Sequence, residues 1–269
     1  MALFSIAVHS SILLTKPEYY FAYKGDKFKY VPATNRSETD RFTGYLKNKA
    51  DEDTLYKKMT EFLSAWAFPH DACVIPEPGM INHANIRLEK FKGGYVAKRS
   101  IQINQTMDSF LKIAIIKNEE QSTILRLYRQ ATSAKNLYFS ILFYWHILTY
   151  PHQDDSFAVN FINSFIKKTD DLTKDDIESI KTEALFSNDT SNFGLYIKNG
   201  VRNSIAHITR RSTHREKNLE IDLLSEERHL YKINSILKIS SREKIYEKLE
   251  EDKTAYFFDD FSYYTPDGI

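Results

Sequence analysis

The stretch ILRLYRQATSAKNLYFSILFYWHILTY, residues 124–150, decides the class of the fold. Apolar residues recur in it every three or four positions, which is the spacing of one buried face of an α-helix. The residues on this face are Ile124, Leu127, Ala131, Ala134, Leu137, Tyr138, Ile141, Leu142, Trp145 and Leu148. The periodicity predicts one long core helix. Its most apolar part, residues 137–150, is too short to cross a bilayer, which takes about 20 apolar residues. We therefore expect a buried helix and no membrane span.

More helices are expected after this one, because Pro151 and the polar residues behind it end the long helix. Apolar spacing predicts them over residues 157–166, 173–184, 192–209 and from 225 toward 249. Thr173 is the expected N-cap of its helix, with Asp176 in a pattern like a capping box, and Ser225 opens the last helix. This part of the chain therefore reads as an all-α bundle.

The first hundred residues have a different pattern. The opening stretch MALFSIAVHSSILLTK alternates as a β-strand does and lacks the basic start of a signal peptide. Residues 18–33 hold two aromatic runs around Gly25, which can supply the positive φ of a tight turn, so they predict a β-hairpin. Residues 51–68 have helical spacing, and residues 95–103 return to strand chemistry.

Together these patterns predict an α+β protein, with an N-terminal mixed α/β domain of unknown role at residues 1–104 and a helical bundle at residues 105–269. A single cysteine, Cys73, excludes a disulfide within the chain. No Cys/His spacing indicates a zinc site, so we expect no metal and no cofactor. These features are typical of a cytoplasmic protein.

Positive charge is concentrated in residues 198–217, although the formal net charge of the chain is only +1. This segment holds Glu216 as its single acid, while the compensating acids lie chiefly in residues 170–183 and 247–260. A local site for a polyanion is therefore expected, and not a protein that binds nucleic acid over its whole surface. The residues that we expect to contact RNA are Lys198, Arg210, Arg211, His214 and Arg215.

Arg202, Asn203 and His207 are the candidate catalytic residues of this segment. Asn203 and His207 are four residues apart, so on a helix they project from nearly the same face, with Arg202 beside them. Cleavage of RNA by its own 2′-OH needs a proton carrier, which histidine supplies near neutral pH, and donors for the charge on phosphorus, which arginine supplies. Asn203 would orient the imidazole or hold a phosphate oxygen, and no metal is needed.

The motif Arg-Asn-x3-His, late in a helical bundle and after the long aromatic helix, resembles the HEPN superfamily and most closely its Apea-like branch. The resemblance covers the chain from about residue 105 onward. It implies a metal-independent endoribonuclease that acts as a homodimer with a composite cleft, in toxin–antitoxin or antiviral defence systems. An antitoxin or sensor protein is then a further expected partner, besides RNA. Some relatives place an acid near the end of the first long helix, where this chain has Leu148, Thr149 and Tyr150.

Simpler interpretations of these candidate residues remain open. Asn203 and His207 could satisfy the end of a core helix, in a noncatalytic module that binds RNA, a nucleotide or a protein partner. His214 is expected more as a surface residue than as a second catalytic histidine. Arg126 and Arg129 are expected on a charged helix face rather than at a phosphate. Residues 152–155, HQDD, have metal-ligand side chains without a spaced partner, so a loop is expected there.

Overall fold

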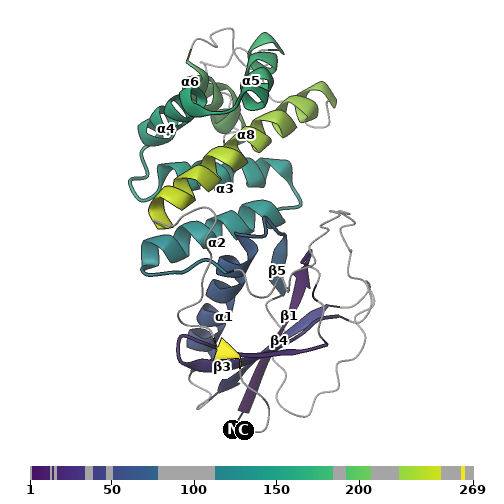
Figure 1. The fold of residues 1–269 in the computed structure, drawn as a ribbon. Helices are drawn as coiled ribbons and strands as arrows, with labels where there is room; N and C mark the ends of the chain where they lie inside the picture. Colours follow the sequence, from purple (N-terminus) through teal and green to yellow (C-terminus); the bar gives the residue numbers. More distant parts are fainter. Residues whose placement is uncertain are drawn as a thin grey trace. The chain divides into compact units, whose positions relative to one another are not determined.

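The computed structural model describes residues 2–12, 14, 17–33, 39–46, 51–77, 113–183, 192–206, 224–249 and 262–263. These form an N-terminal antiparallel sheet and a C-terminal helical region, which confirms the α+β class (Figure 1). The chain divides into two compact units, Met1–Ser133 with Glu251–Ile269, and Ala134–Glu250. The domain boundary expected at 104/105 lies outside the described residues, as does the strand expected at 95–103.

The sheet of the first unit has the strand order β5-β1-β4-β3-β2-β6. Its strands are β1 (Ala2–Ser10), β2 (Tyr19–Tyr23), β3 (Asp26–Val31), β4 (Asp40–Leu46), β5 (Val74–Glu77) and β6 (Ser262–Tyr263). The expected opening strand and hairpin are confirmed. β2 and β3 pair with Phe21 opposite Phe28, and the turn between them has Lys24 at φ 46° and Gly25 at φ 79°.

Helix α1 (Glu52–Ala67) lies across one face of this sheet (Figure 1) and confirms the helix expected at 51–68. Aromatic side chains fill the interface. The ring of Phe62 lies 4.7 Å from that of Phe21 and 5.4 Å from that of Phe42, centroid to centroid. Because each of these rings is fully buried, the core of the unit rests on aromatic packing between the strands and α1.

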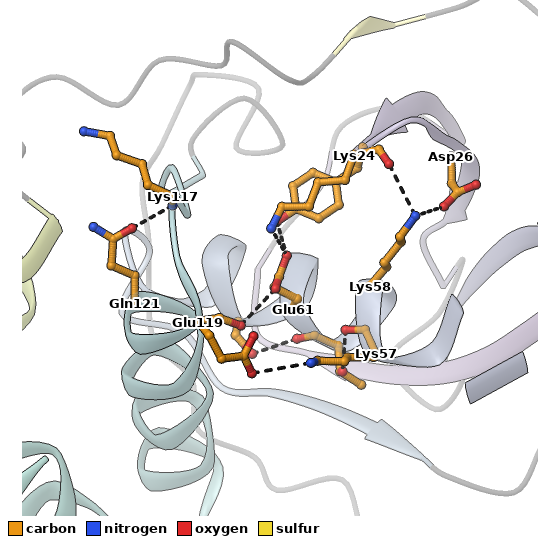
Figure 2. Close-up of polar contacts among 12 residues, drawn as sticks. Lys24, Asp26, Lys57, Lys58, Glu61, Lys117, Glu119 and Gln121 are labelled. Atoms are coloured by element: carbon orange, nitrogen blue, oxygen red, sulfur yellow. Dashed lines mark hydrogen bonds and ion pairs between the residues drawn. The ribbon is translucent and has the colours of Figure 1, made fainter. Parts of the chain in front are cut away.

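Helix α2 (Glu119–Ser133) packs against α1, and the buried carboxylate of Glu61 ties the elements together (Figure 2). Glu61 Oε1 accepts a 3.0 Å hydrogen bond from the Tyr23 hydroxyl and lies 2.5 Å from Lys24 Nζ. Its Oε2 accepts a 2.9 Å bond from Ser122 Oγ. A charge this deep is tolerated because its oxygens are occupied by donors from β2, the hairpin turn and α2.

The expectation for the two arginines of α2 was wrong in one case. Arg126 lies on the outer face and pairs with Glu119, with Nη2 2.5 Å from Oε1. Arg129 is instead 96% buried, and it donates to Ser64 Oγ at 2.9 Å and to the carbonyl of Val74 at 3.2 Å. Burial lowers the pKa of Arg129 to about 10. Arg129 therefore joins α2 to α1 and β5, and is no exposed charge on a helix face.

The single long helix expected across residues 124–148 is two helices. α2 ends at Ser133, and α3 (Leu137–Thr149) begins behind Asn136. Asn136 has an extended backbone, with φ −101° and ψ 126°, and its side chain accepts a 2.8 Å hydrogen bond from the backbone N–H of Tyr138. This N-cap starts a new helix although the apolar spacing continues across it.

The second unit contains α3, α4 (Asp155–Lys168), α5 (Asp171–Glu183), α6 (Phe193–Tyr196), the π-helical segment η3 (Ile197–Arg202), α7 (Asn203–Ala206) and α8 (Leu224–Leu249). α4 and α8 confirm the helices expected at 157–166 and after Ser225. The N-cap expected for α5 was wrong. Asp170, not Thr173, caps it, because Asp170 Oδ1 accepts a 2.7 Å bond from the N–H of Thr173.

Helices α3 and α8 lie side by side in the second unit (Figure 1). Lys244 of α8 is buried, and its Nζ donates to the carbonyls of Leu148 at 2.6 Å and Tyr150 at 3.0 Å. These carbonyls end α3, where a cation stabilises the negative end of the helix dipole. Within the described part of the chain, no helix has the length and apolar character to cross a membrane.

Candidate functional site

The segment 193–206 is helical throughout, but its middle turns have π-helical hydrogen bonding. The N–H of Asn203 donates to the carbonyl of Lys198, five residues earlier. Ile197, Val201 and Ile205 are buried, as the apolar spacing predicts, while residues 207–209 of the expected helix lie outside the described residues. A π turn often marks a functional site, because it displaces side chains from the positions that an α-helix would give them.

This segment is seated closely on α4. A side chain at Gly194 would place its Cβ 2.6 Å from the backbone oxygen of Val159, so only glycine permits this approach. Asn163 Oδ1 accepts a 3.0 Å bond from the N–H of Gly194, and its amide nitrogen donates at 2.8 Å to Asn192, the N-cap of α6. The contacts fix where α6, which leads directly into η3, lies along α4.

Arg202 and Lys198 approach one carboxylate, that of Asp155 at the first position of α4. Lys198 Nζ lies 3.9 Å from Asp155 Oδ2, and Arg202 Nη2 lies 3.9 Å from Asp155 Oδ1. Arg202 Nη1 donates a 2.8 Å hydrogen bond to Asn203 Oδ1. The distances to Asp155 exceed hydrogen-bonding length, so the carboxylate attracts the two cations without locking either of them.

Asp155 is held by α3. Trp145 Nε1 donates a 2.8 Å hydrogen bond to Asp155 Oδ1. The neighbouring Asp154 is the N-cap of α4 and accepts a 2.8 Å bond from the N–H of Ser156, which lowers the pKa of Asp154. Both carboxylates lie at the start of α4, at the positive end of its helix dipole.

His146, one residue after Trp145, adds an imidazole to this cluster. Its pKa lies below the ordinary value because the surrounding protein removes part of the water around the ring and because the charge of Arg202 repels the imidazolium, while Asp155 acts in the opposite direction. The neutral imidazole is therefore favoured near pH 7. A neutral imidazole can accept a proton.

Of the residues expected to form the site, the structure brings together Arg202, Asn203 and Lys198. The others lie outside the described residues, namely His207, Arg210, Arg211, His214 and Arg215. Sequence reasoning missed Asp155, Trp145 and His146. The signal for Asp155 was available, because two aspartates after Pro151 and before an apolar-periodic run are typical of a helix N-terminus. Trp145 and His146 had no local signal beyond the core helix itself.

Comparison with known proteins gives one family. Residues 124–243 match the family described as methylamine utilization protein MauJ. The matched range begins in α2, ends in α8 and contains every residue of the cluster, but it is less than half of the chain. No curated protein and no solved structure matches the chain significantly.

The cluster of Lys198, Arg202, Asn203, Asp155 and His146 thus combines two cations, a hydrogen-bonding amide, a carboxylate and an imidazole. Such a set can hold an oxyanion against the cations and move a proton at the imidazole. The guanidinium fork of Arg202 can present N–H donors to a phosphate. Asp155 limits the positive charge of the cluster, so a bound anion would compete with Asp155 for both cations.

Proposed function

We propose that this protein is a metal-independent endoribonuclease of the HEPN type, cytoplasmic and active in host defence or as a toxin. The observation that carries the proposal is the juxtaposition of Arg202 with Asn203, Lys198 and Asp155 in the helical unit. This is the motif that the sequence singles out, and its arginine is held at a polar cluster instead of in the core. The proposal also includes a homodimer and an antitoxin or sensor protein that restrains the activity.

In the proposed reaction a base removes the proton of a ribose 2′-OH. The 2′-oxygen forms a bond to the adjacent phosphorus, the bond from phosphorus to the 5′-oxygen breaks, and an acid protonates that oxygen. The products are a 2′,3′-cyclic phosphate and a 5′-OH end. Arg202 and Lys198 stabilise the charge on the phosphorane oxygens, and Asn203 orients the guanidinium.

His207 is the proposed proton carrier, and one imidazole cannot serve as base and acid in the same step. Two copies of the motif in a dimer would solve this difficulty. His146 supports a second route, because it lies close enough to Arg202 for that charge to lower its pKa. In that route the neutral His146 of the same chain is the base and His207 is the acid.

A noncatalytic module that binds RNA, a nucleotide or a protein partner is the alternative. It is favoured by Asp155, which partly neutralises the two cations and would weaken their hold on a transition state. The description of the matched family names methylamine utilization and no reaction.

The test is to incubate the purified protein with mixed RNAs in EDTA and to analyse the ends. We expect 2′,3′-cyclic phosphates, lost in Arg202→Ala and His207→Ala and retained in Lys168→Ala. Lys168 is a matched control because it is exposed at the far end of α4, about 20 Å from Asp155 along the helix. A single 2′-deoxy nucleotide should block cleavage at its position. Undiminished cleavage by Arg202→Ala would refute the proposal, and salt-sensitive binding without cleavage would support the module.

A further inference from the structure

An exposed pair of stacked rings lies at the end of α4 that carries Asp155. The rings of His152 and Phe157 are 4.1 Å apart, centroid to centroid, and only 14° from parallel. Phe157 is 45% exposed, and His152 is exposed as well. A phenyl ring so open to water has apolar area left to bury, and here the ring plane is already fixed by its neighbour.

The local chain explains the pair. After α3 the backbone turns through Gln153, whose φ of 55° is unusual for a residue with a side chain. Asp154 then caps α4, and this turn returns His152 toward the first turn of α4, where Phe157 projects. The turn at Gln153 and the N-cap of α4 therefore bring the two rings together.

The pair shares the first turn of α4 with Asp155, the carboxylate that Lys198 and Arg202 each approach to 3.9 Å. Residues 155 and 157 project from different sides of a helix, so one RNA strand would pass around this first turn to reach both the rings and the cations. The nearby acids Asp154 and Asp155 offset part of this positive charge. The phosphates of a nucleic acid would therefore be attracted only modestly here. Tight binding of a nucleic acid needs a second kind of contact. Stacking of a planar base is such a contact, because every nucleobase has a π-face.

We propose that His152 and Phe157 form a base-stacking subsite, which takes one unpaired nucleobase of an RNA strand while Lys198 and Arg202 contact a phosphate of the same strand. The inference rests on the proposed function and adds to it the part of the substrate that is recognised. A base inside a duplex is covered on both faces, so the subsite selects single-stranded RNA or a loop.

The experiment uses a fluorescent 2′-O-methyl RNA of about 12 nucleotides, which binds but cannot be cleaved, and an oligonucleotide with the same backbone but no bases. Dissociation constants are measured for the wild type, Phe157→Ala, Phe157→Trp and Phe139→Ala. Phe139 is the control, because it is also an exposed phenyl, 60% exposed on α3, and is two turns from His146. Phe157→Trp keeps a stacking surface if Phe157→Ala folds poorly.

We expect Phe157→Ala to weaken binding of the base-containing strand about 5- to 140-fold and to leave the baseless strand unchanged. Phe157→Trp should bind within about twofold of the wild type or more tightly, and Phe139→Ala should be unchanged. The dependence of affinity on salt should be the same in the wild type and Phe157→Ala, because stacking releases no counterions. Equal affinity of Phe157→Ala and wild type for the base-containing strand would overturn the subsite, as would an equal loss for both strands.

Two further outcomes separate this inference from the proposed function. If the wild type cleaves ordinary RNA but Phe157→Ala binds like the wild type, the subsite fails and the nuclease proposal survives. If no RNA is cleaved but binding depends on Phe157 and on the bases, the nuclease proposal fails and the subsite stands. Loss of self-association in Phe157→Ala by analytical ultracentrifugation, with unchanged RNA affinity, would assign the rings to a second copy of the chain and overturn the subsite.

Discussion

Arg202 Nη1 donates a 2.8 Å hydrogen bond to Oδ1 of Asn203, the next residue in the chain. Adjacent side chains on an α-helix do not face each other, so this contact depends on the long arginine folding back at the junction of η3 and α7. The bond holds one edge of the guanidinium and leaves its other edge toward Asp155, 3.9 Å away. The hydrogen bond to Asn203 therefore sets the orientation of the Arg202 guanidinium between a bound ligand and Asp155.

The first prediction concerns this bond. In Asn203→Ala the guanidinium should turn to Asp155 and form a closer ion pair, which lowers the single-turnover rate of RNA cleavage about 10- to 100-fold. Asn203→Ala combined with Asp155→Asn should recover part of that loss, because the competing carboxylate is gone. Cleavage at the wild-type rate by Asn203→Ala would show that the amide does not orient the arginine.

The second prediction concerns the pKa of His146, which the charge of Arg202 lowers and that of Asp155 raises. The pKa should rise in Arg202→Gln and fall further in Asp155→Asn, as measured by NMR titration of the imidazole C–H signals. Since the folded pKa lies below the unfolded one, the unfolded state binds more protons, and the contribution of His146 to folding stability is lost as the pH falls from the unfolded value of about 6.5 through the lower folded pKa. An unchanged pKa in both variants would place His146 outside the cluster.

The third prediction compares the two arginines of α2. Arg129→Ala should lower the free energy of unfolding by about 2–4 kcal/mol, because it opens a cavity and removes the hydrogen bonds from the guanidinium to the Ser64 hydroxyl and the Val74 carbonyl. Arg126→Ala removes an exposed pair with Glu119 and should cost less than about 1 kcal/mol. Urea denaturation measures both, and equal values would contradict the burial of Arg129.

The fourth prediction concerns the packing of α6 on α4. Gly194→Ala should destabilise the helical unit by about 1–3 kcal/mol, since the new Cβ would meet the backbone of Val159 and not a movable side chain. The neighbouring Leu195→Ala is the control and should stay within about 0.5 kcal/mol, because Leu195 is exposed. Thermal unfolding measures both, and a neutral Gly194→Ala would show that α6 can move away from α4.

Local patterns predicted much of the fold. Alternation gave β1, Gly25 located the hairpin turn, and apolar spacing gave α1, α4 and α8. The break between α2 and α3 was not predicted because the apolar spacing continues across Asn136, although asparagine is a strong N-cap residue. The π turn at η3 has no signal in residue identity, since a spacing of four between buried residues suits both kinds of helix.

The site was predictable only where it is contiguous in sequence. Arg202 and Asn203 are neighbours, and Lys198 is one turn away, so a motif could find them. Asp155 and His146 come to Arg202 through packing of α3, α4 and η3, which depends on contacts such as that of Gly194 with Val159. Contacts between segments far apart in the chain are not encoded in any one spacing pattern.

The buried ammonium of Lys244 limits where a shortened fragment of this chain can end. Its Nζ holds the carbonyls of Leu148 and Tyr150, and the turn that carries His152 and Asp155 starts from these residues. An expression fragment cut at residue 243, where the family match stops, would lack this donor. A minimal recombinant version that keeps the turn must include Lys244.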